Sequence, residues 1–256
     1  SVAASPIFVG KNGAEKEGSV TSTANLPAKS ISEVRGSVYD LGGDYFYEVP
    51  TDGLVSIWTF SGDADDGWGS NDGTLIGGAS IVDGKLVLDG SGDYVDCGSS
   101  EDFNFGAGDF SISAWMKTET LGTNDRTIIA KRNTATSYWH YRLAYGSNNM
   151  RLYTSAGTAH SYASNGDLRY TDGEWHNVVV VRDSGGFVIH YLDSELMGSV
   201  VDSFVDDTTN TQPVFIGTYN TGVAYPFNGS FDNVMVYGRV LTQEEVAIIY
   251  DVQRKS

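Results

Sequence analysis

The C-terminal segment GSFDNVMVYGRVLTQEEVAIIYD (residues 229–251) joins an alternating run to a short helical pattern. The alternation has period two, which is typical of a β-strand with one buried face. It predicts that Asp232 shares a face with Val234 and Val236, and that the larger apolar side chains occupy the other face. The segment therefore predicts a strand with one embedded carboxylate, which needs a partner because an unpaired buried charge is costly.

The second half of this segment carries complete signals for the start of a helix. Thr242 and Glu245 have the spacing of a capping box, in which each side chain accepts a hydrogen bond from the other residue's backbone N–H. Leu241 and Val246 have the spacing of a hydrophobic staple around that cap. A short final helix is expected after the strand.

Short apolar runs separated by Gly, Asp and Asn continue through the chain from residue 54. The predicted strands span 54–60, 85–88, 93–97, 110–117, 127–131, 139–145, 150–154, 175–182, 187–192, 214–217 and 230–237. The pairs Asp83-Gly84 and Gly185-Gly186 fit tight hairpin turns. Short strands at this spacing predict an all-β fold built as a two-sheet antiparallel sandwich.

Several motifs support a family resemblance through their order. They are IWTF (57–60), GSNDGTL (69–75), GKLVLDGSGDYVDCG (84–98), FSISAWMKT (110–118), DGEWHNVVVVRD (172–183) and FNGSFDNVMVYGRVLTQEEVAIIY (227–250). In this order they resemble laminin-G-like jelly rolls, which belong to the broad group of pentraxins, concanavalin A-type lectins and laminarinase-type glucanases. The resemblance covers residues 54–251. It implies a jelly-roll sandwich with a short C-terminal helix.

Residues 1–50 lie outside that resemblance. They contain Pro6, Pro27 and Pro50, three of the five prolines, and show two possible strands, at 6–9 and 45–49. We expect residues 1–50 to form an N-terminal extension or arm and residues 51–256 to form the laminin-G-like domain. The chain starts at Ser1 rather than Met, which both a processed export signal and a trimmed segment of a longer protein would explain.

The charge balance excludes two classes of partner. The formal net charge is −17, from 33 Asp and Glu against 16 Lys and Arg, so nucleic acid and anionic membrane surfaces would repel the chain. No apolar run is long enough to span a bilayer. Cys97 is the single cysteine, which excludes an intrachain disulfide, and we expect it to be a small buried side chain.

The sequence lacks the usual signatures of catalysis. Retaining glucanases of the related group place two carboxylates on one strand, because the chemistry needs the pair roughly 5 Å apart. The chain contains no E-x-D-x-E or E-x-D-x-x-E string, no metal-binding spacing of histidines and no G-x-S-x-G elbow. We therefore predict a non-catalytic protein. A glycan-active enzyme with an unfamiliar acid pair is the competing hypothesis.

Two places could hold a metal ion. The loop DADDGWGSNDG (63–73), which begins at Asp63, gathers carboxylates among glycines, and oxygen ligands of this kind suit calcium. The same residues are ordinary turn formers, so both interpretations stay open. The family resemblance implies a second place, a structural calcium held by Asp232 and by the backbone carbonyls of Thr59 and Gly84. Arg239 or a backbone amide could satisfy Asp232 instead, and we favour calcium.

A carbohydrate site is expected on the middle strands. In YWHYRLAY (138–145), Tyr138, His140 and Arg142 share one face, and the residues between them are expected in the core. Sugar sites combine aromatic platforms with fixed polar groups, so this outer face is the candidate site, with Asp125 and Tyr225 as rim contacts. High β-propensity of tyrosine explains the same composition without a ligand.

The favoured function is a non-catalytic, secreted or cell-surface module that binds carbohydrate or mediates adhesion and is stabilised by structural calcium. Its expected partner is a glycan or cell-surface polysaccharide. The alternative is a structural subunit of a surface filament or pilus-like assembly. In that case other copies of the chain are the partners, because the N-terminal arm would add a strand to a neighbour's sheet.

Overall fold

The computed structural model describes residues 8–9, 15–16, 38–40, 45–47, 49–119, 124–132, 137–144, 149–156, 159–164, 169–201, 206–221 and 224–254. The chain divides into two compact units. The larger unit is Val55–Val240, and the smaller unit combines Ser1–Leu54 with Leu241–Ser256.

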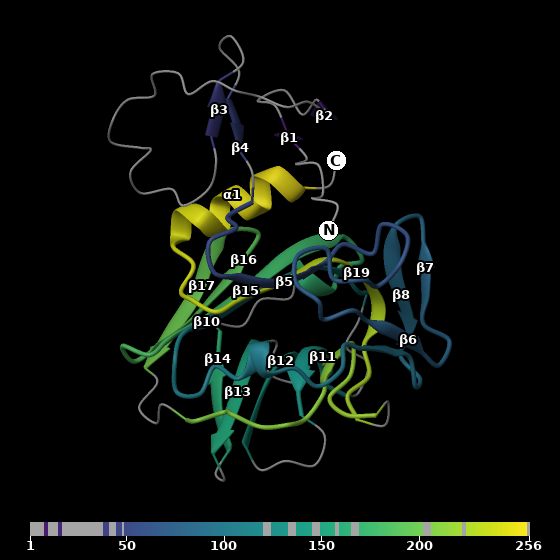
Figure 1. The fold of residues 1–256 in the computed structure, drawn as a ribbon, viewed down its shortest axis with the longest axis vertical. Coiled ribbons are helices and arrows are strands. Elements are labelled where there is room, and N and C mark those ends of the chain that lie inside the picture. The colour runs from purple at the N-terminus through teal and green to yellow at the C-terminus, as the bar shows by residue number, and fades with distance from the viewer. Residues whose placement is uncertain are drawn as a thin grey trace. The chain divides into compact units, whose positions relative to one another are not determined.

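The larger unit is built from two antiparallel sheets, which Figure 1 shows as separate layers. The seven-stranded sheet has the order β14 (Ala159–Ala163), β13 (Asn149–Ala156), β12 (Ser137–Ala144), β11 (Arg126–Lys131), β18 (Val214–Ile216), β9 (Tyr94–Asp96), β6 (Thr74–Ile76). The eight-stranded sheet has the order β17 (Glu195–Val201), β16 (Phe187–Leu192), β15 (Trp175–Asp183), β10 (Phe110–Lys117), β19 (Asn228–Tyr237), β8 (Lys85–Asp89), β7 (Ser80–Val82), and β5 (Leu54–Trp58) also pairs with β19. Two short 3-10 helices, Glu101–Phe103 and Arg169–Thr171, lie in the connections.

The hydrophobic core takes alternate side chains from both sheets. In β10 these include Ile112 and Met116, and in β12 they include Trp139 and Tyr141. Successive side chains of a strand point to opposite faces, so each strand gives one set of residues to the core and the other set to the outer surface of the sandwich. The predicted all-β, two-sheet antiparallel fold is confirmed.

Both predicted hairpin turns are present. Asp83 and Gly84 join β7 to β8 with φ of 50° and 70°, the left-handed conformation that a two-residue turn of this type requires at both positions. Gly186 N–H donates to the Asp183 carbonyl in the turn between β15 and β16. The turn between β16 and β17 was not predicted, because it uses Asp193 and Ser194 with positive φ and contains no glycine.

The predicted facing of Asp232 is wrong, because β19 contains a β-bulge. Trp115 of β10 pairs with Asp232, and Ser113 of β10 pairs with Met235. Between these two pairs β19 therefore contains one residue more than β10. Asn233, inside the bulge, has φ of 46°. The extra residue reverses the alternation, so that Phe231 joins Val234 and Val236 in the core, and Asp232 lies on the outer face of the sheet.

The smaller unit contains a four-stranded antiparallel sheet and one helix. The sheet order is β2 (Glu15–Lys16), β1 (Phe8–Val9), β4 (Tyr45–Tyr47), β3 (Val38–Asp40). The predicted strands at 6–9 and 45–49 therefore exist in shorter form. Apart from β2, β3 and residues 49 and 50, the rest of the predicted arm lies outside the described residues. The assignment of residues 1–50 to an arm remains a prediction.

The helix α1 (Gln243–Gln253) begins as the sequence predicts. Thr242 Oγ1 accepts a hydrogen bond from Glu245 N at 3.2 Å, and Thr242 N donates to Glu245 Oε2 at 2.9 Å, which completes the capping box. Leu241 and Val246, the two residues of the expected staple, are both buried. Among the described residues, no helix has the length and apolar character needed to cross a membrane.

Candidate functional site

A cluster of tyrosine, arginine and histidine side chains occupies the outer face of β12 and β13. Tyr138, His140 and Arg142 alternate with core residues along β12, as expected. Across the sheet, His140 lies opposite Tyr153 and Arg142 lies opposite Arg151. Directly opposed residues share a face of the sheet, so these side chains form one continuous surface.

His140 is the centre of this cluster. Its ring stacks on Tyr138, with centroids 5.6 Å apart, and on Tyr153 at 4.6 Å, and it meets Tyr219 edge-on at 4.9 Å. Only 2 % of the residue is exposed, and neither ring nitrogen has a hydrogen-bond partner among the described residues. Burial, together with the nearby Arg142 and Arg132 guanidiniums, holds the pKa of His140 well below its usual value, so the ring is neutral at physiological pH.

Two arginines lie over the tyrosine rings. The Arg132 guanidinium carbon is 3.8 Å from the ring centroid of Tyr138 and 4.3 Å from that of Tyr219. The Arg142 guanidinium carbon is 4.0 Å from the Tyr153 centroid and 4.7 Å from the Tyr225 centroid. A guanidinium stacked in this way is attracted by the ring face and keeps its N–H edges available for other contacts.

Asp125 and Tyr225 come to the cluster from neighbouring loops. Asp125 Oδ2 forms an ion pair with Arg142 Nε, and the two atoms are 3.0 Å apart. The N–H of Arg142 Nε does not have the geometry of a hydrogen bond to this oxygen. Tyr225 is 36 % exposed and has a φ of 53°, which is unusual for a bulky side chain. Its carbonyl accepts a hydrogen bond from Thr127 N at 2.9 Å, which fixes the loop to β11. Strained residues of this kind gather at functional sites.

All the residues predicted to contact a ligand therefore lie in one cluster: Tyr138, His140, Arg142, Asp125 and Tyr225. Their role in binding remains a prediction. Arg132 and Tyr219 belong to the same cluster and were not predicted. Arg132 lies one residue beyond β11 and Tyr219 lies in the loop after β18, so no strand alternation relates either residue to β12. Only the pairing of β11 with both β12 and β18 brings them together.

Asp232, the first predicted calcium ligand, forms an ion pair with Lys85, with Nζ and Oδ2 2.9 Å apart. The same ammonium donates to the carbonyl of Gly84 at 3.1 Å. A methyl group on Gly84 would lie 3.8 Å from Ser61 Cα, so the β7–β8 turn lies beside the residues that follow β5, among them Thr59. One ammonium group thus contacts oxygen atoms of two predicted calcium ligands, Asp232 and Gly84, and calcium binding there stays a prediction. Lys85 itself was not predicted as a partner.

The loop after β5 is organised by Asp66 rather than by Asp63. Asp66 Oδ1 accepts hydrogen bonds from the N–H groups of Ile57 and Trp68, and Oδ2 accepts one from Asn71 N. Asp63 forms a local turn by accepting from Asp65 N at 3.2 Å. Repulsion from Asp63 is the main cause that raises the pKa of Asp65.

This geometry favours the interpretation of these acids as turn formers. Among the described residues, no group of three or more His, Cys, Asp or Glu side chains is placed to hold a metal ion.

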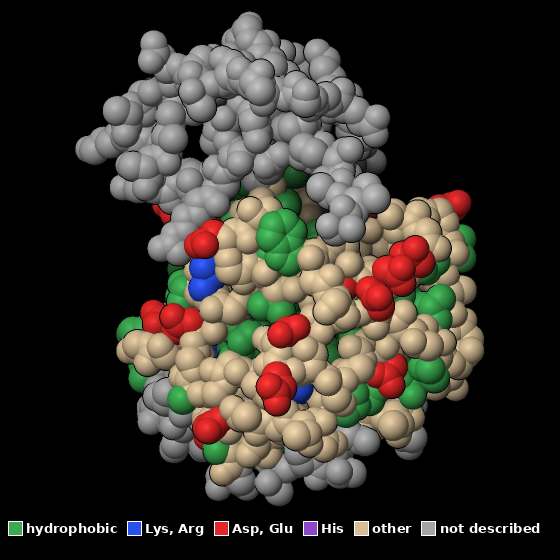
Figure 2. Space-filling model, viewed as in Figure 1, with side chains coloured by type: hydrophobic (Ala, Val, Ile, Leu, Met, Phe, Trp, Pro, Cys, Tyr) green, Lys and Arg blue, Asp and Glu red, His purple; other side chains and the backbone are tan. Residues whose placement is uncertain are grey.

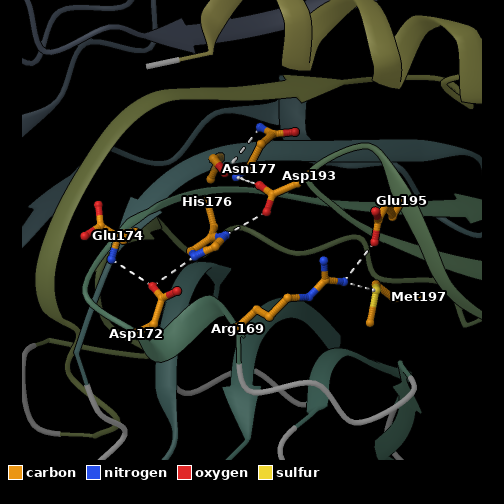
Figure 3. Close-up of polar contacts among 9 residues, drawn as sticks. Arg169, Asp172, Glu174, His176, Asn177, Asp193, Glu195 and Met197 are labelled. Carbon is orange, nitrogen blue, oxygen red and sulfur yellow. Dashed lines mark hydrogen bonds and ion pairs between the residues drawn. The ribbon is translucent and has the colours of Figure 1, made fainter. Parts of the chain in front are cut away.

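His176 has both ring nitrogens engaged by carboxylates. Nδ1 is 2.7 Å from Asp193 Oδ2 and Nε2 is 3.1 Å from Asp172 Oδ1, and Figure 3 shows the two acids at opposite edges of the ring. Burial acts to lower the pKa of His176, but the two carboxylates outweigh it and raise the pKa above its usual value. With both nitrogens occupied, this histidine joins the start of β15 to the β16–β17 turn.

Comparisons with known proteins agree with this architecture. A family model described as the concanavalin A-like lectin/glucanases superfamily matches residues 89–247. No curated protein sequence matched the chain.

Among solved structures, the receptor-binding domain of a botulinum neurotoxin C/D mosaic serotype has a TM-score of 0.64 and 16% sequence identity. The match covers 79% of this chain and 52% of that one. The binding domain of botulinum neurotoxin DC in complex with rat synaptotagmin II has a TM-score of 0.63 and 15% sequence identity. That match covers 79% of this chain and 52% of the other. The chain thus spans about half the length of these structures. Since the family model covers more than half of the chain, the protein belongs to the concanavalin A-like lectin/glucanase superfamily.

Proposed function

We propose that this protein is a non-catalytic module that binds carbohydrate outside the cell. The observation that carries the proposal is the cluster on β12 and β13, where His140 is buried with both ring nitrogens unpartnered among the described residues. A buried polar group without a partner costs free energy, and a bound ligand would remove that cost.

The cluster has the chemistry that sugar recognition requires. Tyrosine rings offer flat apolar surface for the C–H face of a sugar ring. Neutral His140 has one donor and one acceptor nitrogen, so one sugar hydroxyl would accept at the first nitrogen and a second hydroxyl would donate to the other. Of the aromatic residues in the cluster, Tyr225 is the most exposed, so it is the expected first contact for a ligand.

The structural relatives favour binding over catalysis. Both toxin fragments are described as binding domains, and one was solved in complex with synaptotagmin II. Lectins of the same superfamily bind their ligands without chemical change. A role at the cell surface or in the extracellular medium agrees with this proposal.

Replacing Tyr225 tests the site. Tyr225→Ala is expected to weaken binding of the glycans that the wild type recognises on a broad array by about fivefold, because one aromatic contact of about 1 kcal/mol is lost. Phe187→Ala is the matched control, since Phe187 is an exposed aromatic residue on β16 of the other sheet. A wild type that recognises nothing on the array would contradict the proposed function. Equal losses in the two variants would contradict the assignment of the site.

We also propose that calcium binds at Asp232 and Gly84, taking the position of the Lys85 ammonium. Lys85 has 29% of its side chain exposed, so the ammonium can move into solvent when a calcium ion binds. Asp232 would supply a charged oxygen and Gly84 a backbone carbonyl. The ion would fix β19 to the β7–β8 hairpin and stabilise the larger unit.

Calcium dependence of the melting temperature tests this second proposal. The wild type is expected to melt at a higher temperature in calcium than in EDTA, since ligand at 100 times its Kd adds about 2.7 kcal/mol to stability. Asp232→Asn should abolish the shift and Lys85→Met should enlarge it. Asp63→Asn, in the turn-forming loop, should leave the shift unchanged. If calcium has no effect on the wild type, Lys85 is the permanent partner of Asp232.

A further inference from the structure

We propose that the cluster on β12 and β13 selects acidic sugars, which carry a carboxylate. The inference rests on the proposed function of this site and specifies its class of ligand. It follows from where the positive charges of an acidic protein are placed.

The strands that carry the cluster come from a stretch of sequence without acids. Residues 126–166 contain none of the 33 Asp and Glu residues and five of the 16 Lys and Arg residues. The five are Arg126, Lys131, Arg132, Arg142 and Arg151. The loop that supplies Tyr219 and Tyr225 is also free of acids, since residues 208–231 contain none. In a chain with a net charge of −17, this part of the sandwich is locally basic.

Two of these arginines lie directly opposite each other. Arg142 and Arg151 are paired residues of β12 and β13 and share the outer face of the sheet. Like charges at directly opposed positions repel each other, and Asp125 offsets part of this repulsion through its ion pair with Arg142. An anion bound between or beside the two guanidiniums would reduce the remaining repulsion.

Arg132 adds a third guanidinium at the other side of His140. It stacks between the rings of Tyr138 and Tyr219, and its Nε has no hydrogen-bond partner among the described residues. Among the residues named as members of the cluster, three are arginines and one, Asp125, is an acid, which forms an ion pair with Arg142. The positive groups therefore outnumber the negative ones at the site.

The chemistry of these groups points to a carboxylate. A guanidinium binds a carboxylate through two parallel N–H···O bonds, and such charged pairs are stronger than hydrogen bonds between neutral groups. The nearby tyrosine rings suit the sugar ring that bears the carboxylate. On the face shown in Figure 2, acidic side chains are spread over the surface and few basic ones are visible.

Short matched ligands test the inference. The probes are trisaccharides of galacturonic, guluronic and mannuronic acid, each paired with its methyl ester, which keeps the sugar and removes the charge. We expect the wild type to bind at least one acid about tenfold more tightly than its ester in isothermal titration. Trisaccharides rather than polymers keep the long-range repulsion by the acidic protein small.

Variants locate the effect at the cluster. Arg132→Gln is expected to lower affinity for the acid about tenfold and to leave affinity for the ester nearly unchanged. Arg169→Gln is the matched control, because Arg169 is not one of the cluster residues and pairs with exposed Glu195, as Figure 3 shows. Melting curves of the two variants report whether each folds.

The outcomes separate this inference from the proposed function. Equal affinity for every acid and its ester, with binding still lost in Tyr225→Ala, would overturn the preference for acids and leave the sugar site standing. Preference for a sulfated neutral trisaccharide over all the uronic acids would overturn the assignment to carboxylates. Absence of binding to these probes and to a broad array would overturn both proposals.

Discussion

Two histidines of the larger unit, His140 in one sheet and His176 in the other, have opposite electrostatic environments. His140 lies among arginines and tyrosines and its pKa is held well below the usual value. His176 lies between Asp172 and Asp193 and its pKa is raised. The two differ because burial favours the neutral form in both, and only His176 has carboxylates that stabilise its charge.

His176 makes a testable contribution to pH-dependent stability. A pKa raised on folding means that the charged ring stabilises the native state below its ordinary pKa of 6.5, and that this stabilisation is lost as the pH rises through the raised value. His176→Gln should therefore lower the free energy of unfolding more at about pH 5.5 than at about pH 8.5, measured by urea denaturation.

Asp193→Asn provides the comparison for this prediction. Asn tolerates the positive φ of this position, so the substitution removes the charge without straining the turn. It should reduce the same pH dependence. An equal loss of stability at both pH values in His176→Gln would assign the histidine a packing role only.

At the scale of elements, the strands missed by sequence analysis share one property. Four strands of the larger unit were not predicted, and they are the edges of the two sheets: β6, β7, β14 and β17. An edge strand has one neighbour and is often short or exposed, so its residues need not alternate between apolar and polar. β6 and β7 have three residues each and β17 contains Gly198, whereas the predicted central strands contain long apolar runs.

The helix start was predicted correctly because its signals are local. Thr242 and Glu245 contact each other within one turn, and no distant residue is needed to place them. Thr242→Ala is expected to destabilise the first turn of α1 by about 1 kcal/mol, since the amides near the start lose an acceptor. Faster hydrogen exchange at Glu244 and Glu245 would report this loss. Thr242→Ser, which keeps the hydroxyl, should show little change, and unaltered exchange in the alanine variant would contradict the role of the cap.

At the scale of the whole molecule, the net charge of −17 acts against the compact state. The acids outnumber the bases about two to one, and their mutual repulsion is long-range at low salt. Raising the ionic strength from about 0.01 M to about 0.15 M shortens the Debye length from about 30 Å to about 8 Å, so repulsion between distant carboxylates falls.

The melting temperature should therefore rise with salt at neutral pH. The same increase in sodium chloride should have a much smaller effect near pH 4.4, the isoelectric point, where the net charge is close to zero. Differential scanning calorimetry at the two pH values measures both effects. If sodium chloride raises the melting temperature equally at both pH values, the increase comes from the effect of salt on the burial of apolar surface and not from screening of the acids.

The fold class follows from local and periodic properties of the chain. Strand alternation, turn residues such as Asp83 and Gly84, and the cap at Thr242 are each readable over a few residues, and together they leave few architectures besides a sandwich with a final helix. The alternation along β12 is also readable from the sequence, and it correctly assigns Tyr138, His140 and Arg142 to one face of the strand.

Two decisive features depend on contacts between distant residues. The bulge that turns Asp232 outward is seen only in the register between β19 and β10. Alternation along the sequence does not reveal it, because nothing in the residue pattern marks the one extra residue. The partners of His140 come from β13 and from the loop after β18, brought together by strand pairing. Sequence periodicity assigns each side chain to a face of its own strand, and only the register between strands decides which side chains meet there.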